Sequence, residues 1–312
     1  MARAWLRSVA LWWCLGFGVS GVWGATAVAI VSADQGSVYM EAAEAIVDQL
    51  RRQGVVAPEV LRLTAAELDS SDVLLRNPPR LVVTLGTEAL GRVLGKGYRG
   101  TTVAGLIPRT SYERLVKEVG KTAPASISAV FLDQPFGRQL DLVRLAMPDV
   151  QRVGVLWGAE SESLQAALQA NISARAMELK SNTVVPGALF SGLKDLLGNV
   201  DVLLAVADTQ VYNGTTLPNI LLATYRARIP VVAFSPAYVK AGALLALYVT
   251  PTQVGSQVGV MVRATLQGLP LAPPQLAQDY TIAVNDYVAR SMELTLDVKT
   301  LTEQLRRMDK RP

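Results

Sequence analysis

Short, uniformly apolar segments alternate with longer amphipathic ones along most of the chain, and this alternation constrains the fold most strongly. Residues 26–32, 80–85 and 102–107 are apolar runs of strand length, and residues 38–52 carry apolar side chains at helical spacing. Strands that are apolar on both faces are buried between two layers, and helices of crossover length join them into parallel pairs. The pattern therefore predicts an α/β protein built on parallel sheets.

The same alternation starts again in the second half of the chain. Further apolar runs of strand length lie at residues 128–132, 152–157, 201–205 and 230–234. A long helix is expected over residues 161–179, and residues 121–126 have the composition of a join between the halves. The two halves share this organisation without a clear sequence repeat, which predicts two doubly wound lobes.

The first 24 residues have the pattern of a secretory signal peptide. Arg3 and Arg7 form a basic start, residues 9–19 are apolar, and Gly24 ends a short stretch that suits a signal peptidase. The apolar run is shorter than the roughly 18 residues that a membrane span needs. We therefore predict cleavage after Gly24 and a periplasmic mature chain, with an uncleaved membrane anchor as the alternative.

Missing residue types exclude several classes of function. The chain has no histidine, and its one cysteine, Cys14, lies in the predicted signal peptide. Histidine catalysis, histidine metal ligation and disulfide chemistry are thereby excluded from the mature chain. The formal charge falls from +4 to +2 when Arg3 and Arg7 are removed. The mature chain therefore lacks the large excess of basic residues that is typical of nucleic-acid-binding proteins. With no enzyme motif present, we predict no catalytic residue, metal site or cofactor.

Loops beyond the carboxyl ends of the expected strands contain the candidate binding residues, because open parallel sheets bind ligands there. Hydroxyl and small residues stand where helices begin, and free N–H groups at helix starts can hold an anionic group. The candidate ligand-binding residues are Ser32, Asp34, Thr87, Gly158, Ser161, Asp208, Thr209 and Ser235. For Thr87 and Ser161 the alternative is a simple helix cap, and for Asp34 and Asp208 a turn or cap residue.

A set of segments resembles the ABC-transporter substrate-binding proteins of the tryptophan/tyrosine type. The segments are QLDLV at 139–143, MP at 147–148, QRVGVLW at 151–157, ADT at 207–209, IPVVAFS at 229–235, VKAGAL at 239–244, QVG at 253–255 and RLVVTLGT at 80–87. Their order and spacing carry the resemblance, which covers most of the mature chain. It implies the type I periplasmic-binding-protein fold, in which two Rossmann-like lobes with parallel sheets are joined by hinge crossings.

The resemblance also implies how the chain is divided between the lobes. Residues 25–127 plus 252–278 form the first lobe, and residues 128–251 plus 279–312 form the second. Thr87 and Asp208 are then the best ligand contacts, with Asp208 pairing with an amine. Ser32, Gly158 and Ser235 come next.

The function implied is that of a periplasmic solute-binding protein. It captures a small ligand, an amino acid or an aromatic compound, between its lobes and delivers it to an ABC permease in the membrane. The sequence departs from the family pattern at Glu88 and at residues 236–238, within the expected cleft. A ligand sensor or adaptor of the same fold, acting on a membrane signalling protein or receptor, is therefore an alternative, and an enzyme is a more remote one. We expect a monomer.

Overall fold

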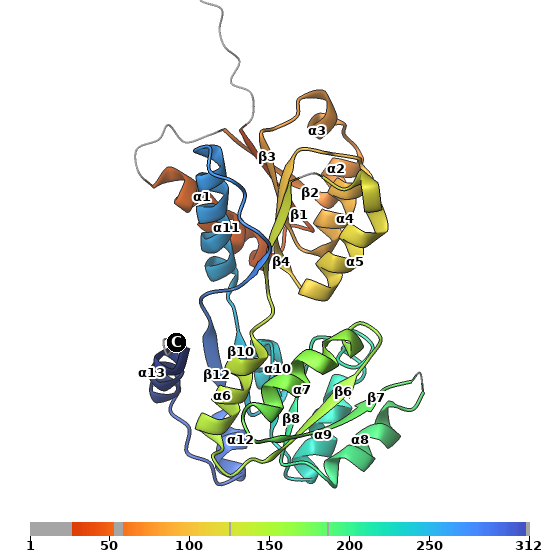
Figure 1. Ribbon diagram of the computed structural model, residues 1–312, viewed down its shortest axis with the longest axis vertical. Coiled ribbons are helices and arrows are strands. Elements are labelled where there is room, and N and C mark those ends of the chain that lie inside the picture. Colours follow the sequence, from red (N-terminus) through yellow and green to blue (C-terminus); the bar gives the residue numbers. More distant parts are fainter. Residues whose placement is uncertain (1–26, 53–58, 125, 186, 310–312) are drawn as a thin grey trace, which may run out of the picture.

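The structure, a computed structural model, describes residues 27–52, 59–124, 126–185 and 187–309. The predicted signal peptide and its cleavage site after Gly24 lie outside these residues. Figure 1 shows two α/β lobes stacked along the long axis of the molecule and joined by several connections. Within the described ranges, no helix combines the length and apolar character that crossing a membrane requires.

The first lobe is built on a six-stranded sheet in the order β11-β5-β4-β3-β1-β2. Every pairing in it is parallel. Its strands are β1 (Val28–Ser32), β2 (Val60–Thr64), β3 (Leu81–Leu85), β4 (Thr101–Ile107), β5 (Ile127–Phe131) and β11 (Gln275–Leu276). The central strands β1 and β3 are almost wholly buried because helices cover both faces of the sheet. Those helices are α1 (Ser37–Arg51), α2 (Ala65–Asp69), α3 (Val73–Arg76), α4 (Thr87–Gly95), α5 (Arg109–Val119) and α11 (Pro251–Leu266).

Helix α11 comes late in the chain but packs against α1 in the first lobe (Figure 1). Gly255 allows this contact, since a Cβ there would lie 2.3 Å from the carbonyl oxygen of Ala42. Gly259 faces the Gln49 side chain, which a Cβ there would meet at 2.6 Å. The absence of side chains at both positions lets the two helix backbones approach closely.

The second lobe is built on a six-stranded sheet in the order β12-β10-β9-β8-β6-β7. Only β12 is antiparallel to its neighbour. The strands are β6 (Arg152–Trp157), β7 (Glu178–Thr183), β8 (Val202–Leu204), β9 (Val231–Ala233), β10 (Leu245–Tyr248) and β12 (Thr281–Val284). One apolar cluster joins this sheet to α6 (Phe136–Ala146), α7 (Gln165–Ser173), α12 (Asp286–Ser291) and α13 (Val298–Asp309). A second cluster joins it to α8 (Leu189–Leu197), α9 (Leu217–Arg226) and α10 (Pro236–Ala241).

Three crossings connect the lobes, and they fix which sheet edges face each other. The first follows β5 at residues 132–135, the second joins β10 to α11, and the third joins β11 to β12. Because β5 and β10 both end in a crossing, and their parallel neighbours end at the same edges, the carboxyl ends of both sheets point toward the opposite lobe. The loops that follow the strands therefore border the space between the lobes.

The expected fold class is confirmed, with corrections to individual boundaries. The limit between lobes at residues 127 and 128 is wrong, because β5 pairs in parallel register with β4 and completes the first sheet. The stretch 121–126 accordingly leads from α5 to β5 within one lobe. The helix expected over residues 161–179 ends early at Ser173, and Ala176 with φ 52° breaks the chain direction before β7 begins.

Helix α13 was not predicted from the sequence. Its side chains Leu301 and Leu305 are buried in the apolar cluster of the second lobe, against α6 and β12. Spacing of four residues places both on one helical face. The C-terminal segment is thus a packed helix of the second lobe.

Candidate functional site

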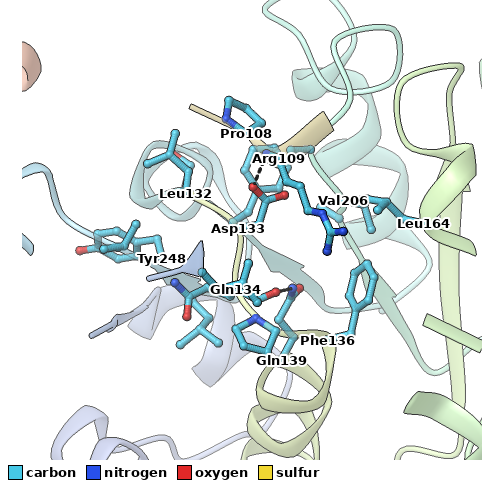
Figure 2. A pocket seen from close by; sticks show the side chains of 18 of the residues that line it. Pro108, Arg109, Leu132, Asp133, Gln134, Phe136, Gln139, Leu164, Val206 and Tyr248 are labelled. Atoms are coloured by element: carbon cyan, nitrogen blue, oxygen red, sulfur yellow. Dashed lines mark hydrogen bonds between the residues drawn. The ribbon is translucent and has the colours of Figure 1, made fainter. Parts of the chain in front are cut away.

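A cavity of about 440 Å³ opens where the two lobes meet at the crossings (Figure 2). Its wall combines first-lobe residues, the first two crossings and the carboxyl edge of the second sheet, and most of the side chains are apolar. The lining residues are Pro108, Arg109, Leu132, Asp133, Gln134, Pro135, Phe136, Gln139, Leu164, Ala167, Ala205, Val206, Ala207, Phe234, Ser235, Pro236, Leu247, Tyr248, Val249 and Leu276. A small molecule in this cavity would contact both lobes at once.

Asp133 places a carboxylate in this apolar wall, directly after β5. Its Oδ2 accepts a hydrogen bond from the backbone N–H of Arg109 at 2.7 Å, as Figure 2 shows. The Arg109 guanidinium itself donates to Glu113 Oε1 at 2.7 Å. Loss of solvent raises the pKa of Asp133, and the Arg109 N–H offsets part of this effect. In the part of the chain that the structure describes, no lysine or arginine forms a salt bridge with Asp133.

Gln134 lies next to Asp133 on the first crossing, and only 7% of its surface is exposed. Its Oε1 accepts from Arg138 Nη1 at 2.8 Å, and its backbone oxygen accepts from Gln139 Nε2 at the same distance. Arg138 also pairs with Asp309 of α13 at 3.0 Å. These contacts attach the first crossing to the second lobe, so this side of the cavity wall is held by side chains of α6 and α13.

Two loops of the second lobe are tied together beside the cavity by a reciprocal set of hydrogen bonds. We call Glu160, Ser161, Asp208 and Thr209 the loop clamp. Asp208 is 4% exposed and accepts from Ser161 Oγ at 2.8 Å, from Ser161 N at 2.9 Å and from Glu160 N at 3.1 Å. Glu160 in turn accepts from Thr209 N at 3.0 Å and from Thr209 Oγ1 at 2.9 Å.

Gly158 makes the loop clamp possible. A Cβ at this position would lie 2.3 Å from the carboxylate oxygen of Asp208. The loop after β6 can therefore fold over Asp208 only because Gly158 has no side chain. Ser161 Oγ also accepts from the Gly158 N–H at 3.1 Å, which closes the turn.

The eight residues predicted from the sequence fall into three groups in the structure. Ser235 lines the cavity, and its side chain caps α10 by accepting from Ala237 N at 3.3 Å. Gly158, Ser161, Asp208 and Thr209 make or support the loop clamp and are not among the lining residues. Ser32, Asp34 and Thr87 lie at the carboxyl edge of the first sheet, outside the cavity.

The side chains of the first-lobe group form few hydrogen bonds within the described residues. Asp34 is exposed and accepts from Gly36 N at 2.5 Å within its own loop. Thr87 begins α4 after Gly86, whose φ of 98° favours glycine and at which a Cβ would lie 3.0 Å from the Tyr39 ring. The pKa of the Tyr39 hydroxyl is raised by burial and by the nearby charges of Asp34 and Glu88.

Asp133 and Gln134 line the cavity but were not among the residues predicted from the sequence. The misplaced lobe boundary assigned β5 to the second lobe, and the loop after it was not among the loops selected in either lobe. A signal was present, because an acid and an amide directly follow an apolar strand at residues 128–132. The rule that pointed to Thr87 and Asp208 also points to these two residues.

Comparison with known families agrees with this architecture. The sequence profile of the ABC transporter substrate binding protein family matches residues 114–306. The chain belongs to this family. The match confirms the family that the sequence segments indicated. A search of the curated proteins finds no match.

Solved structures similar to this substrate-binding protein share its fold across nearly their whole length. A domain from Streptococcus pneumonia in complex with L-Trp is 17% identical, with 88% of this chain and 97% of that chain covered and a TM-score of 0.62. A ligand-free, open substrate-binding protein with adhesive properties from Clostridium difficile is 16% identical, with 86% and 95% covered and a TM-score of 0.69. A periplasmic ribose ABC transporter from Conexibacter woesei is 14% identical, with 86% and 96% covered and a TM-score of 0.54. These likenesses establish the type I periplasmic binding fold.

Proposed function

We propose that this protein captures a small ligand in the cavity between its lobes and delivers it, from the periplasm, to an ABC permease. The observation that carries the proposal is the cavity itself, whose wall includes both lobes and the first two crossings. A ligand there contacts both lobes, so it favours whichever lobe arrangement gives it more contacts. Binding can then change the relative position of the lobes, which a membrane partner can recognise.

The cavity wall indicates the chemistry of the ligand. Phe136, Phe234 and Tyr248 contribute aromatic surface, and Leu132, Leu164 and Leu247 contribute aliphatic surface. Burying apolar area is worth about 25 cal/mol per Å². A ligand with an aromatic or branched apolar body gains this stabilisation, whereas a sugar needs a polar partner for each hydroxyl. The lining therefore favours a ligand of the kind held by the Streptococcus relative, L-Trp, over one such as ribose.

The lobe edges supply the remaining contacts in this proposal. Ser32, Asp34 and Thr87 lie on the carboxyl edge that faces the second lobe, and they reach a bound ligand when the edges approach. The loop clamp presents the opposing edge in a fixed shape. We propose a monomer, because the contacts that the function needs are all within one chain.

A thermal-shift screen of the mature chain, residues 25–312, tests the proposal. The library contains amino acids, aromatic acids, apolar amines, nucleosides and sugars. A ligand at 100 times its dissociation constant stabilises the folded state by about 2.7 kcal/mol. We expect hits among compounds with an apolar body.

Two matched variants assign the hit to the cavity. Ala167 is exposed on α7 and lines the cavity, so Ala167→Trp fills the space without removing core contacts. Ala166 is its exposed neighbour on the helix and does not line the cavity. Ala167→Trp should abolish the shift and Ala166→Trp should retain it. Equal binding by both variants, or no hit across the library, would rule out this cavity as the capture site.

A further inference from the structure

Asp133 retains acceptor capacity that faces the cavity. An ionised carboxylate offers about four lone-pair sites on its two oxygens. Among the described residues, Oδ2 accepts a hydrogen bond from Arg109 N at 2.7 Å, and the backbone N–H of Asp133 itself also stabilises the carboxylate. The side chain is half-buried and lines the cavity, so a bound ligand can reach it.

The charge of Asp133 has no full compensation within the protein. A carboxylate in an apolar wall is costly unless a cation or several donors accompany it. The Arg109 guanidinium compensates part of this charge and lowers the pKa of Asp133, but it is paired with Glu113 at 2.7 Å and is half-exposed. The pKa of Asp133 is raised mainly because burial removes water from the carboxylate, which is also why its charge is costly here. A cation supplied by the ligand would remove this cost on binding.

The loops around the cavity have an acidic bias that the whole chain lacks. Lysine and arginine outnumber aspartate and glutamate by 30 to 26 over the chain. By contrast, the loops after β1, β5, β6 and β8 carry acids and no lysine or arginine, whereas Arg109, which begins α5 after β4, is a cation in the cavity wall. The acids of these loops are Asp34, Asp133, Glu160 and Asp208. Their summed field attracts a cation toward the space between the lobes and repels an anion.

We propose that Asp133 is the counter-charge for a ligand cation, so that the protein selects ligands with a protonated amine on an apolar body. The inference rests on the proposed function and narrows its ligand class. Apolar walls hold the body, and the Asp133 carboxylate accepts hydrogen bonds from the ammonium group. A carboxylic acid of the same size lacks this interaction and meets the negative charge of Asp133.

Matched pairs of probes test the head group alone. Tryptamine is compared with indolepropionate, phenethylamine with hydrocinnamate, and isoamylamine with isocaproate, by calorimetry on the mature chain at neutral pH. Each pair has a similar apolar body and differs in the charge of its head group. We expect each amine to bind at least about 10-fold more tightly than its acid, as one charge-assisted hydrogen bond allows.

Asp133→Asn keeps an oxygen for the Arg109 N–H and removes the charge. We expect it to weaken the amines about 10- to 100-fold and to leave the acids unchanged or tighter. Asp279→Asn is the control, because Asp279 is an exposed carboxylate on the third crossing and does not line the cavity. This variant should bind every probe with the same affinity as the wild type.

The outcomes separate this inference from the proposed function. Amine binding that Ala167→Trp abolishes and Asp133→Asn weakens supports both. Cavity binding in which acids equal amines, or in which Asp133→Asn has no effect, overturns the role of Asp133 and leaves ligand capture intact. Absence of binding by every probe and every compound of the wider library overturns both.

Discussion

The carboxyl edges of the two lobes face each other but are built differently. In the second lobe, Asp208 and Glu160 bind the loops after β6 and β8 to each other through buried or bidentate hydrogen bonds. In the first lobe, one hydrogen bond, from Arg109 N to Asp133 at 2.7 Å, joins the ends of β4 and β5, whereas Asp34 bonds within its own turn and Glu88 forms a long pair with Arg92 at 3.5 Å. The second edge is thus fixed before any ligand arrives, whereas the first edge has side chains whose hydrogen-bonding groups are largely open to solvent.

This difference suggests a division of work between the lobes. The cavity is lined mainly by the second lobe and the crossings, which is the part with the fixed edge. A rigid surface loses little conformational entropy when it binds. The first lobe can then add contacts from its freer side chains as the edges approach. Three matched pairs of substitutions test the contrast, in order of decreasing expected effect, and a fourth change, Asp133→Asn, tests the charge in the cavity wall.

Asp208→Ala should have the largest effect. It leaves the buried N–H of Ser161 and the Ser161 hydroxyl without their acceptor, together with the N–H of Glu160. We expect a loss of about 2–4 kcal/mol in the free energy of unfolding, measured by urea titration. Asp34→Ala in the first lobe should cost less than about 1 kcal/mol. Equal losses at the two sites would contradict the contrast between the edges.

Gly158→Ala should come second. The new Cβ meets the Asp208 carboxylate, which cannot retreat because protein donors hold it. Overpacking of this kind costs about 1–3 kcal/mol. Gly36→Ala is the matched change, since its Cβ would meet Asp34 at 2.7 Å, but Asp34 is exposed and free to turn. A loss above about 1 kcal/mol at Gly36, by the same titration, would show that the first edge is also fixed.

Glu160→Ala should have a smaller effect. It removes the acceptor of the Thr209 N–H and hydroxyl, which lie at the surface where water can replace it. We expect a loss of about 1 kcal/mol, and faster amide hydrogen exchange at residues 208–210. Glu88→Ala in the first lobe should stay within about 0.5 kcal/mol. Unchanged exchange at Thr209 would mean that Glu160 does not hold the loop.

Asp133→Asn should have the smallest effect on the ligand-free protein, and one that depends on pH. The folded state raises the pKa of Asp133, so between the ordinary and the raised value it holds the proton more tightly than the unfolded chain does. The wild type therefore loses stability as the pH rises through this window, and the variant does not. Arg109 and Glu113, the charged neighbours of Asp133, are common to both proteins.

Thermal unfolding over a range of pH tests this expectation. The variant should be the more stable protein at neutral pH, and the difference should vanish near pH 3, at which the wild-type carboxyl is protonated in both states. A wild type that is more stable than the variant at neutral pH would show that Asp133 is already compensated within the protein.

Much of the architecture could be predicted from the sequence, because apolar strands report burial directly. The strands at 80–85 and 152–157 appear almost as expected in β3 and β6. The boundary at β5 could not be placed this way, since a buried strand has the same pattern in either sheet. Helix α13 was missed because its polar face and basic end outweigh the two leucines that pack.

The site was harder to predict than the fold. Asp208 follows a buried strand. A ligand contact is expected at such a position, but a residue that hydrogen-bonds a neighbouring loop can occupy the same position. What distinguishes the two is the position of Ser161 in space, which is 47 residues away in the chain. Asp133 also follows a buried strand, and it lines the cavity because of how that strand, β5, packs in the first sheet. Both assignments depend on long-range packing, which local sequence does not encode.

The packing of α11 against α1 has a consequence for the order in which the chain can fold. Arg263 Nη1 donates to the backbone oxygen of Gln49, across 214 residues of sequence. The first lobe therefore lacks one of its covering helices until nearly all of the chain has been synthesised. Contacts over such separations form slowly, because a long loop must close before they contribute stability. A nascent chain of this protein is thus expected to reach its stable form only after synthesis, with the first lobe completed by residues that follow most of the second.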